Sequence, residues 1–204
     1  FVFEALGVCW AQDLGMQEYY SLEKENVRLW NSNQDGQRWD VFRYNNFAHN
    51  TLTVNGGKHQ VKGMVPFLAT YTKDAKLGAN LDMTSLFGDD LKKATREVVL
   101  IKEQYLQVTD RVQAAGKPAS VRWTMVTSAT PKQLDAHTME LTKEGKKLHL
   151  VLDSPSSASF SVIDNVPSHS YDAPNPGSVR IIFDADLKAG QKETLKVRFV
   201  PVNE

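Results

Sequence analysis

The chain of 204 residues contains a single cysteine, Cys9, so it cannot form an internal disulfide framework. Cys9 stands beside Trp10 in an apolar run, a setting that is typical of a buried core thiol rather than of a nucleophile. This cysteine usage fits either a cytosolic protein or an exported protein that needs no disulfides.

The chain also lacks an excess of charge and a long apolar run. Its 24 basic and 24 acidic side chains balance, so no global field favours nucleic acid or an anionic membrane surface. No segment approaches the roughly 18 consecutive apolar residues that a membrane span needs. We therefore expect neither a nucleic-acid partner nor a membrane span.

Short motifs that announce a catalytic class are absent too. The chain has no GxSxG, HExxH, Walker A or GxGxxG pattern. It opens on Phe1-Val2-Phe3-Glu4, without an initiator methionine and without a signal peptide. This apolar start leads us to expect a fragment of a longer protein that begins in a β-strand.

What the sequence does have is a long series of short apolar or alternating runs separated by turn residues. Residues 195–199 place Leu, Val and Phe on one face and Lys and Arg on the other, and Glu144-Gly145-Lys146 is typical of a hairpin turn. We expect strands at 1–6, 8–11, 52–54, 61–72, 79–84, 97–101, 105–112, 120–127, 139–142, 148–152, 159–163, 179–183 and 193–200. This spacing, with no convincing amphipathic helix, predicts an all-β fold: one large antiparallel two-sheet β-sandwich domain over residues 1–204.

Two segments depart from the strand pattern. Residues 86–93 suggest a turn of helix before a strand. Residues 16–30 are polar, charged and rich in tyrosine, and together with residues 31–37 they predict a long connection. Long loops inside compact β domains often carry function, so this connection is a candidate binding segment.

The stretch from Arg43 to Val54 holds the most informative histidine of the chain. His49 is preceded by Arg43, Tyr44 and Asn46, followed by Asn50, and then by the alternating strand at 52–54. These side chains have the donors and acceptors to bind an anionic or hydroxyl-rich ligand, or a metal ion. The alternative interpretation is a turn that contains one ordinary histidine.

Asp13 is a second candidate because it ends a strand and is followed by Gly15. It is either a turn former or a carboxylate that faces His49 across neighbouring strands. An Asp and a His form only a partial metal site, since zinc needs three or four protein ligands. The other histidines stand in turns or at polar strand positions, where we expect surface residues: His59, His137, His149 and His169.

Tyr19 and Tyr20 begin the long connection six and seven positions after Asp13. A tyrosine can act as a general acid or as a platform on which a sugar ring stacks. The alternative is that one of the pair packs against the edge of the sandwich.

Taken together, these residues resemble the β-sandwich domain of the heparinase II/III-like polysaccharide lyases. The order of the first 60 residues is the specific part of the resemblance, and two later segments are similar to the pair of strands that follows the motif in that family. The matching segments are Phe3-Glu4-Ala5, Trp10-Ala11-Gln12-Asp13-Leu14-Gly15, Tyr19-Tyr20, Arg43-Tyr44, His49-Asn50-Thr51-Leu52-Thr53-Val54-Asn55-Gly56, Gln60, and residues 96–100 and 105–112.

The resemblance implies a catalytic partner domain that this chain does not contain. In full-length members an N-terminal α/α toroid packs against the sandwich, and an acidic polysaccharide lies in the cleft between them. The reaction is β-elimination: the proton at C5 of a uronate is removed once the uronate carboxylate is neutralised, and the 4-linked sugar leaves. The implied parent is a periplasmic or secreted lyase of uronate glycans such as heparin or heparan sulfate, with Tyr19 and Tyr20 as catalytic candidates and Arg43, Tyr44, Asn46 and Asn50 on the substrate side.

The resemblance also implies zinc or another divalent metal in the parent. Its ligands would be Asp13, His49 and a histidine a few residues before Phe1. Because that third ligand is missing from the sequence, we expect weak or no metal binding by this chain, and no lyase turnover.

Two other functions remain open from the residues themselves. The four tryptophans and six tyrosines are compatible with a non-catalytic carbohydrate-binding module. Against that, Trp10, Trp39 and Trp123 lie in patterns that predict core positions. A structural partner domain without any ligand is the third possibility.

Overall fold

The computed structural model describes residues 1–73 and 75–202. The strands are β1 (Phe3–Ala5), β2 (Val8–Ala11), β3 (Leu52–Val54), β4 (Phe67–Lys73), β5 (Lys76–Asp82), β6 (Leu91–Ile101), β7 (Tyr105–Ala114), β8 (Ala119–Thr127), β9 (Thr130–Gln133), β10 (Thr138–Lys143), β11 (Lys146–Ser154), β12 (Ser161–Asp164), β13 (Val179–Leu187) and β14 (Lys192–Val202). The helical elements are α1 (Tyr19–Glu23) and the 3-10 turns η1 (Gln37–Asp40), η2 (Phe42–Tyr44), η3 (Asn46–Ala48) and η4 (Thr84–Leu86).

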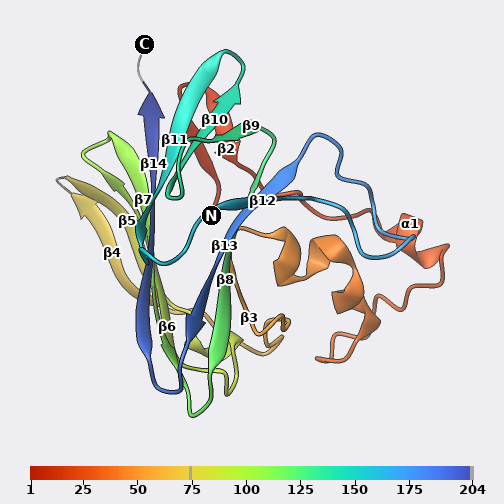
Figure 1. The fold of residues 1–204 in the computed structure, drawn as a ribbon. Coiled ribbons are helices and arrows are strands. Elements are labelled where there is room, and N and C mark those ends of the chain that lie inside the picture. The colour runs from red at the N-terminus through yellow and green to blue at the C-terminus, as the bar shows by residue number, and fades with distance from the viewer. Residues whose placement is uncertain (74, 203–204) are drawn as a thin grey trace.

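Two antiparallel sheets face each other, which confirms the predicted all-β sandwich (Figure 1). The larger sheet has eight strands in the order β4-β5-β6-β7-β14-β11-β10-β9, and the smaller has four in the order β12-β13-β8-β3. The β1–β2 hairpin forms a separate two-stranded sheet. The sheets are unequal in width, so β4 and β5 extend past the region that the smaller sheet covers.

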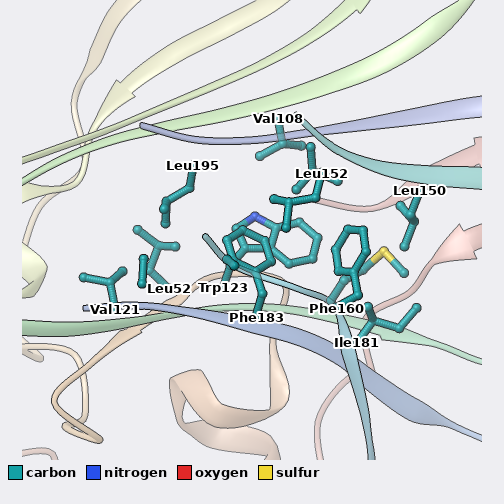
Figure 2. Close-up of a cluster of buried hydrophobic side chains, with 14 of the residues drawn as sticks. Leu52, Val108, Val121, Trp123, Leu150, Leu152, Phe160, Ile181, Phe183 and Leu195 are labelled. Carbon is teal, nitrogen blue, oxygen red and sulfur yellow. The ribbon is translucent and has the colours of Figure 1, made fainter. Parts of the chain in front are cut away.

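The core lies between the two sheets and is built by the alternation visible in the sequence. Leu195, Val197 and Phe199 of β14 are fully buried. On the facing sheet, Trp123 of β8 stacks on its cross-strand partner Phe183 of β13 with ring centroids 5.4 Å apart (Figure 2). The inward face of each strand is therefore apolar, and this fixes which side chains of the smaller sheet point outward.

A lateral lobe, made of residues 17–48 and the loop 165–178, covers the outer face of the smaller sheet (Figure 1). It has its own apolar cluster of Leu22, Val27, Leu29 and Val41, separate from the main core. Hydrogen bonds from one side chain join the two parts of the lobe: the Gln17 side chain donates to the Tyr171 carbonyl and accepts from the Ala173 amide, at 2.7 and 2.8 Å. The predicted long connection is thus an ordered lobe, and the short helix α1 within it was not predicted.

Three details of the larger sheet differ from the sequence-based predictions. The strand expected at 61–72 begins only at Phe67, because Pro66 has no amide hydrogen for a ladder and Gly63 sits where a Cβ would lie 2.7 Å from a Leu86 methyl group. The edge strand β9 was missed because it contains Pro131, which an edge strand tolerates.

The third difference is the turn of helix predicted for residues 86–93, which is wrong. The 3-10 turn η4 ends at Leu86, and the long strand β6 starts at Leu91. The buried and exposed positions of β6 begin at Leu91, ahead of the strand that was expected at residues 97–101.

Among the described helices, none is long and apolar enough to cross a membrane.

Candidate functional site

Asp13 lies just beyond the end of β2, where the chain leaves the sandwich. Gln12 still donates its amide to the Val126 carbonyl at 3.0 Å, and the chain then turns at Gly15, which has a φ of +67°. The Gly15 amide donates to Asp13 Oδ1 at 2.8 Å, so this carboxylate also closes its own turn. The turn leaves the second carboxylate oxygen, Oδ2, directed at another segment.

That segment is the end of η3, and the residue that Oδ2 meets is His49. The Nδ1 atom of His49 lies 2.6 Å from Asp13 Oδ2, and its Nε2 atom lies 3.2 Å from the Arg43 carbonyl oxygen. The two side chains are 33% and 44% exposed, for His49 and Asp13 respectively, so a ligand can reach them. The structure therefore brings the two predicted metal ligands together, while their role as ligands stays a prediction.

The Asp13–His49 contact changes the acidity of the carboxyl group. Burial by itself raises the pKa of Asp13, but the hydrogen bonds from His49 and the Gly15 amide outweigh it, so the net pKa lies below the ordinary value. Asp13 is consequently a carboxylate anion at neutral pH, which is the form that a cation or an imidazolium requires.

Asn50 sits directly behind this pair and is buried. Its side-chain amide donates to the carbonyls of Phe1 and Gln12, at 2.7 and 3.0 Å, and its Oδ1 accepts from the Val126 amide at 2.7 Å. Both N–H groups are thus used inside the fold, and the arrangement ties the residues on either side of the β1–β2 hairpin to β8. In this structure Asn50 supports the Asp13 turn, and it has no free donor for a substrate.

Asn46 and Arg43 are engaged in the same way. Asn46 is buried and donates to Thr53 Oγ1 at 2.9 Å, while its Oδ1 accepts from the His59 amide at 3.0 Å. Arg43 donates to the carbonyls of Leu14 and Pro174, at 3.2 and 3.0 Å, and to the side chain of Asn175. Both residues therefore hold loops in place around His49.

Tyr44 and Tyr19 belong to an aromatic cluster in the lateral lobe. Their rings meet edge to face with centroids 6.2 Å apart, and the Arg38 guanidinium lies 5.1 Å above the Tyr44 ring. The Tyr44 hydroxyl donates to the Gln17 carbonyl, and burial with the neighbouring Tyr19 raises the pKa of Tyr44. Tyr19 accepts a hydrogen bond from Arg38, whereas the Tyr20 side chain is 71% exposed, so the structure separates the two predicted catalytic candidates.

A pocket of about 350 Å³ opens beside His49, between the lobe and the edge of the smaller sheet. Its walls bring together residues from η1, from the segments before and after β3, and Leu86 of η4, which is more distant in the sequence. The residues that matter for its chemistry are Trp39, Tyr44, His49, Lys58 and His59.

Two of these residues correct the sequence-based predictions. Trp39 is half-buried at the pocket wall, not in the core, because it belongs to η1, where its indole donates to the Asn33 carbonyl at 3.0 Å. His59 is half-buried rather than a free surface residue: its Nε2 lies 2.8 Å from the Leu52 carbonyl and its ring packs edge to face on Phe87. Burial lowers the pKa of His59 despite that hydrogen bond.

Lys58 completes the pocket by pairing with the Asp40 carboxylate. The sequence reasoning missed Trp39, Lys58 and His59 because each follows a turn, and only the return of the lobe onto the sheet makes them neighbours. The flanking charges of Arg38 and Asp40 were the one sequence signal that Trp39 is not a core residue.

Asp13 and His49 fit two positions of a divalent-metal site, because a carboxylate and an imidazole are both good zinc ligands. Within residues 1–73 and 75–202, no group of three His, Cys, Asp or Glu side chains is placed to bind a metal. The Phe1 carbonyl, held by Asn50, places the start of the sequence next to this pair. Because the pair supplies only two ligands, it can bind a cation tightly only with a further ligand.

Comparison with known proteins gives one family model, which identifies the family, and several solved structures, which share the fold. The family model described as "Heparinase II/III-like, C-terminal" matches residues 1–196. No curated protein matches the chain in sequence.

Among solved structures, a crystal structure of heparinase III is similar with a TM-score of 0.69 and 14% identity, covering 97% of this chain and 28% of that one. Heparan sulfate lyase HepC from Pedobacter heparinus gives a TM-score of 0.66 at 15% identity, over 97% of this chain and 29% of that one. The heparinase III BT4657 gene product gives 0.67 at 15% identity, over 97% and 28%. The chain thus spans less than a third of the length of the structures that it matches.

Proposed function

Because the chain belongs to the heparinase II/III-like C-terminal family, we propose that it forms the sandwich half of a polysaccharide lyase that cleaves uronate-containing glycans by β-elimination. In this proposal the chain alone is inactive, and an N-terminal toroid of the same protein supplies the other wall of the cleft. The parent enzyme is periplasmic or secreted. Its substrate is an acidic polysaccharide of the heparin or heparan sulfate type.

The observation that carries this proposal is the Asp13–His49 contact at the rim of a pocket lined by aromatic and cationic side chains. Trp39 and Tyr44 offer ring faces and edges to a sugar, and Lys58, His49 and His59 bring groups that can face a carboxylate or a hydroxyl. A uronate loses its C5 proton only when its carboxylate is neutralised, so a cleft wall with such groups suits the reaction.

The metal belongs to the same proposal. Asp13 and His49 would hold two positions of zinc or another divalent ion in the parent, and a residue before Phe1 would supply a third. The ion would fix the Asp13 turn against the end of η3 and add positive charge to the cleft wall. In the 204-residue chain we expect this binding to be weak or absent.

The catalytic candidates differ in how free their hydroxyls are. Tyr19 is enclosed by Arg38, Tyr44 and Trp30, so its first role is to shape the lobe. Tyr20 is exposed and is the freer of the two to meet a substrate or a partner domain. We propose Tyr20 as the member of the pair that faces the glycan.

A second candidate function is a non-catalytic carbohydrate-binding module. The position of Trp39 favours it, because a half-buried indole in a pocket wall is a usual platform for a sugar ring. The two functions differ in what the Trp39 pocket of the isolated chain does: a module binds glycan there by itself, whereas half of a cleft does not.

Kinetics of the longer protein test the lyase proposal. We expect Trp39→Ala to lower kcat/KM on a uronate polysaccharide by roughly tenfold or more, since it removes a stacking surface. The control is the Phe67→Ala variant, which should leave kcat/KM unchanged. Phe67 is an exposed aromatic residue on β4, an edge strand of the larger sheet. The 204-residue chain should form no unsaturated uronate product, and Trp39→Ala should leave its calorimetric trace with uronate oligosaccharides unchanged.

Three results would contradict the proposal. Product formation by the 204-residue chain would show that no second domain is needed. Calorimetric binding by the chain that is lost in Trp39→Ala, together with an inactive longer protein, would favour the module. Equal values of kcat/KM for the Trp39→Ala and Phe67→Ala variants would mean that the pocket is not part of the substrate cleft.

A further inference from the structure

A second, smaller pocket lies on the outer face of the smaller sheet, where the lateral lobe meets β8 and β13. Its volume is about 200 Å³. It is distinct from the pocket at His49, with which it shares no lining residue. The side chains that decide its chemistry are Arg122, Thr124, Val166, Ser168, Arg180 and Phe42.

Arg180 of β13 is the unusual member of this pocket. It is half-buried, with its guanidinium 5.2 Å above the Phe42 ring, and it donates to the carbonyls of Phe47 and Asp164, each at 3.2 Å. A guanidinium has five N–H donors, so these two bonds leave three without a protein partner among the described residues. One of them, at Nε, is buried.

Arg122 of β8, in the same pocket, has a different environment. It forms a bidentate pair with Asp184, with Nε–Oδ1 and Nη2–Oδ2 distances of 2.8 and 2.9 Å. The antiparallel register explains the contrast, since Asp184 stands opposite Arg122 whereas the apolar Val126 stands opposite Arg180. The sheet therefore provides a counter-charge for one arginine and none for the other.

No carboxylate in the described part of the chain lies within 4 Å of the Arg180 guanidinium. Burial lowers the pKa of Arg180, and the positive charge of Arg122 lowers it further, yet an arginine stays protonated in proteins. A half-buried cation without a counter-ion is unfavourable, because the Phe42 ring and two carbonyls replace only part of the lost hydration. An anion that entered the pocket would relieve this cost.

We propose that this pocket binds a single oxyanion group, a carboxylate or a sulfate, through the free N–H donors of Arg180. The volume supports one such group rather than a whole saccharide, since pockets that enclose larger ligands usually measure about 300 Å³ or more. The hydroxyl groups of Thr124 and Ser168 in the same wall can add hydrogen bonds to the anion. This inference is independent of the proposed lyase function, because it uses none of the residues of the Asp13–His49 site.

The Nε–H signal of Arg180 in a nitrogen–proton correlation spectrum gives a direct test. Titrating the 204-residue chain with sodium sulfate, against sodium chloride at equal ionic strength, should shift this signal along a saturable curve. A shift that is identical in both salts, or that never saturates, overturns the proposal.

A pair of variants at Val166, which lines the pocket and is 66% exposed, keeps the test independent of folding. Val166→Glu brings a carboxylate to the rim that competes for Arg180, so we expect sulfate binding to weaken by about tenfold or more. Val166→Gln has nearly the same shape without the charge and should bind sulfate like the parent chain. Equal sulfate binding by both variants contradicts the proposal.

The source of the oxyanion is decided by comparing probes. A sulfated uronate disaccharide that saturates the Arg180 signal at a roughly tenfold lower concentration than inorganic sulfate identifies a glycan group as the ligand. Equal or weaker binding of the disaccharide identifies a site for a free inorganic anion. In both cases the Arg180 signal must respond in the Val166→Gln variant, and the response in Val166→Glu must need a concentration of the same probe that is higher by about tenfold or more.

Discussion

The Nδ1 atom of His49 lies 2.6 Å from the Oδ2 atom of Asp13, although 36 positions separate the two residues in the chain. The imidazole is held from its other side by the Arg43 carbonyl, 3.2 Å from Nε2. Contacts on both ring nitrogens fix the orientation of the ring, and the buried amide of Asn50 fixes the two chain segments that carry the pair.

This contact predicts how stability depends on pH. The folded-state pKa of Asp13 lies below its ordinary value of 3.8, so its contribution is fully present above that value and is lost as the pH falls through the folded pKa. Asp13→Asn should therefore lower the free energy of unfolding at pH 7 by less than about 1 kcal/mol, because the pair is partly exposed. In urea titrations of both proteins, the difference should shrink between pH 5 and the acid limit of folding.

A difference between parent and Asp13→Asn that stays constant across this pH range would contradict the ion-pair interpretation. It would mean that the substitution acts only through the turn that Asp13 closes with the Gly15 amide.

Zinc titration gives the second prediction. With two ligands in reach, the 204-residue chain should bind zinc weakly, and the ring signals of His49 should respond first. In the His49→Ala variant, zinc should no longer shift the backbone amide signals around Asp13. His137→Ala is the control: the ring of His137, whose Nε2 lies 3.1 Å from the Ser156 carbonyl, stands before β10, and its removal should not affect zinc binding. Tight stoichiometric zinc binding that survives His49→Ala would exclude this pair as ligands.

The sequence was enough to predict the sandwich and to select Asp13 and His49, because both follow from local patterns: alternation of apolar residues, and polar residues at strand ends. It predicted a core position for Trp39, which is wrong, because the large aromatic ring was weighted above the flanking charges of Arg38 and Asp40. It also could not show that the amide of Asn50 is used up internally, because its partners come from strands that only the tertiary fold brings together.

The third prediction concerns a buried ion pair under the site. Arg96 and Asp110 are 5% and 0% exposed, joined by two bonds of 2.6 and 2.8 Å, and Arg96 also donates to the Asn50 carbonyl at 2.8 Å. Asp110→Asn leaves a buried guanidinium without its counter-charge and should cost about 3–5 kcal/mol in urea unfolding. It should also shift the backbone amide signals of Asn50 and His49.

The control for this loss is the pair of Arg198 and Asp153, with bonds of 2.8 Å and side chains 32% and 22% exposed; Lys196 also lies 3.3 Å from the same carboxylate. Asp153→Asn should cost about 1 kcal/mol, since solvent reaches both partners and screens their interaction. Similar losses for Asp110→Asn and Asp153→Asn would mean that burial of the first pair does not determine its contribution.

The fourth prediction compares two buried tryptophans that differ in one hydrogen bond. Trp10 and Trp123 are both fully buried, but Trp10 Nε1 donates to the Ala5 carbonyl at 2.9 Å, whereas Trp123 Nε1 has no partner among the described residues. Trp→Phe removes similar ring volume at each site. At position 10 it also leaves a carbonyl without its donor, while at position 123 it removes an N–H group that was unsatisfied.

Trp10→Phe should therefore be more destabilising than Trp123→Phe by about 1–3 kcal/mol in urea unfolding at equal denaturant slopes. The result matters for the site because the Trp10 hydrogen bond ties β1 to β2, and Asp13 follows β2 by two residues. A larger loss for Trp123→Phe would mean that its stack on Phe183 outweighs the cost of an unpaired N–H group. In that case the cavity left in the core, and not hydrogen bonding, would set the order of the two variants.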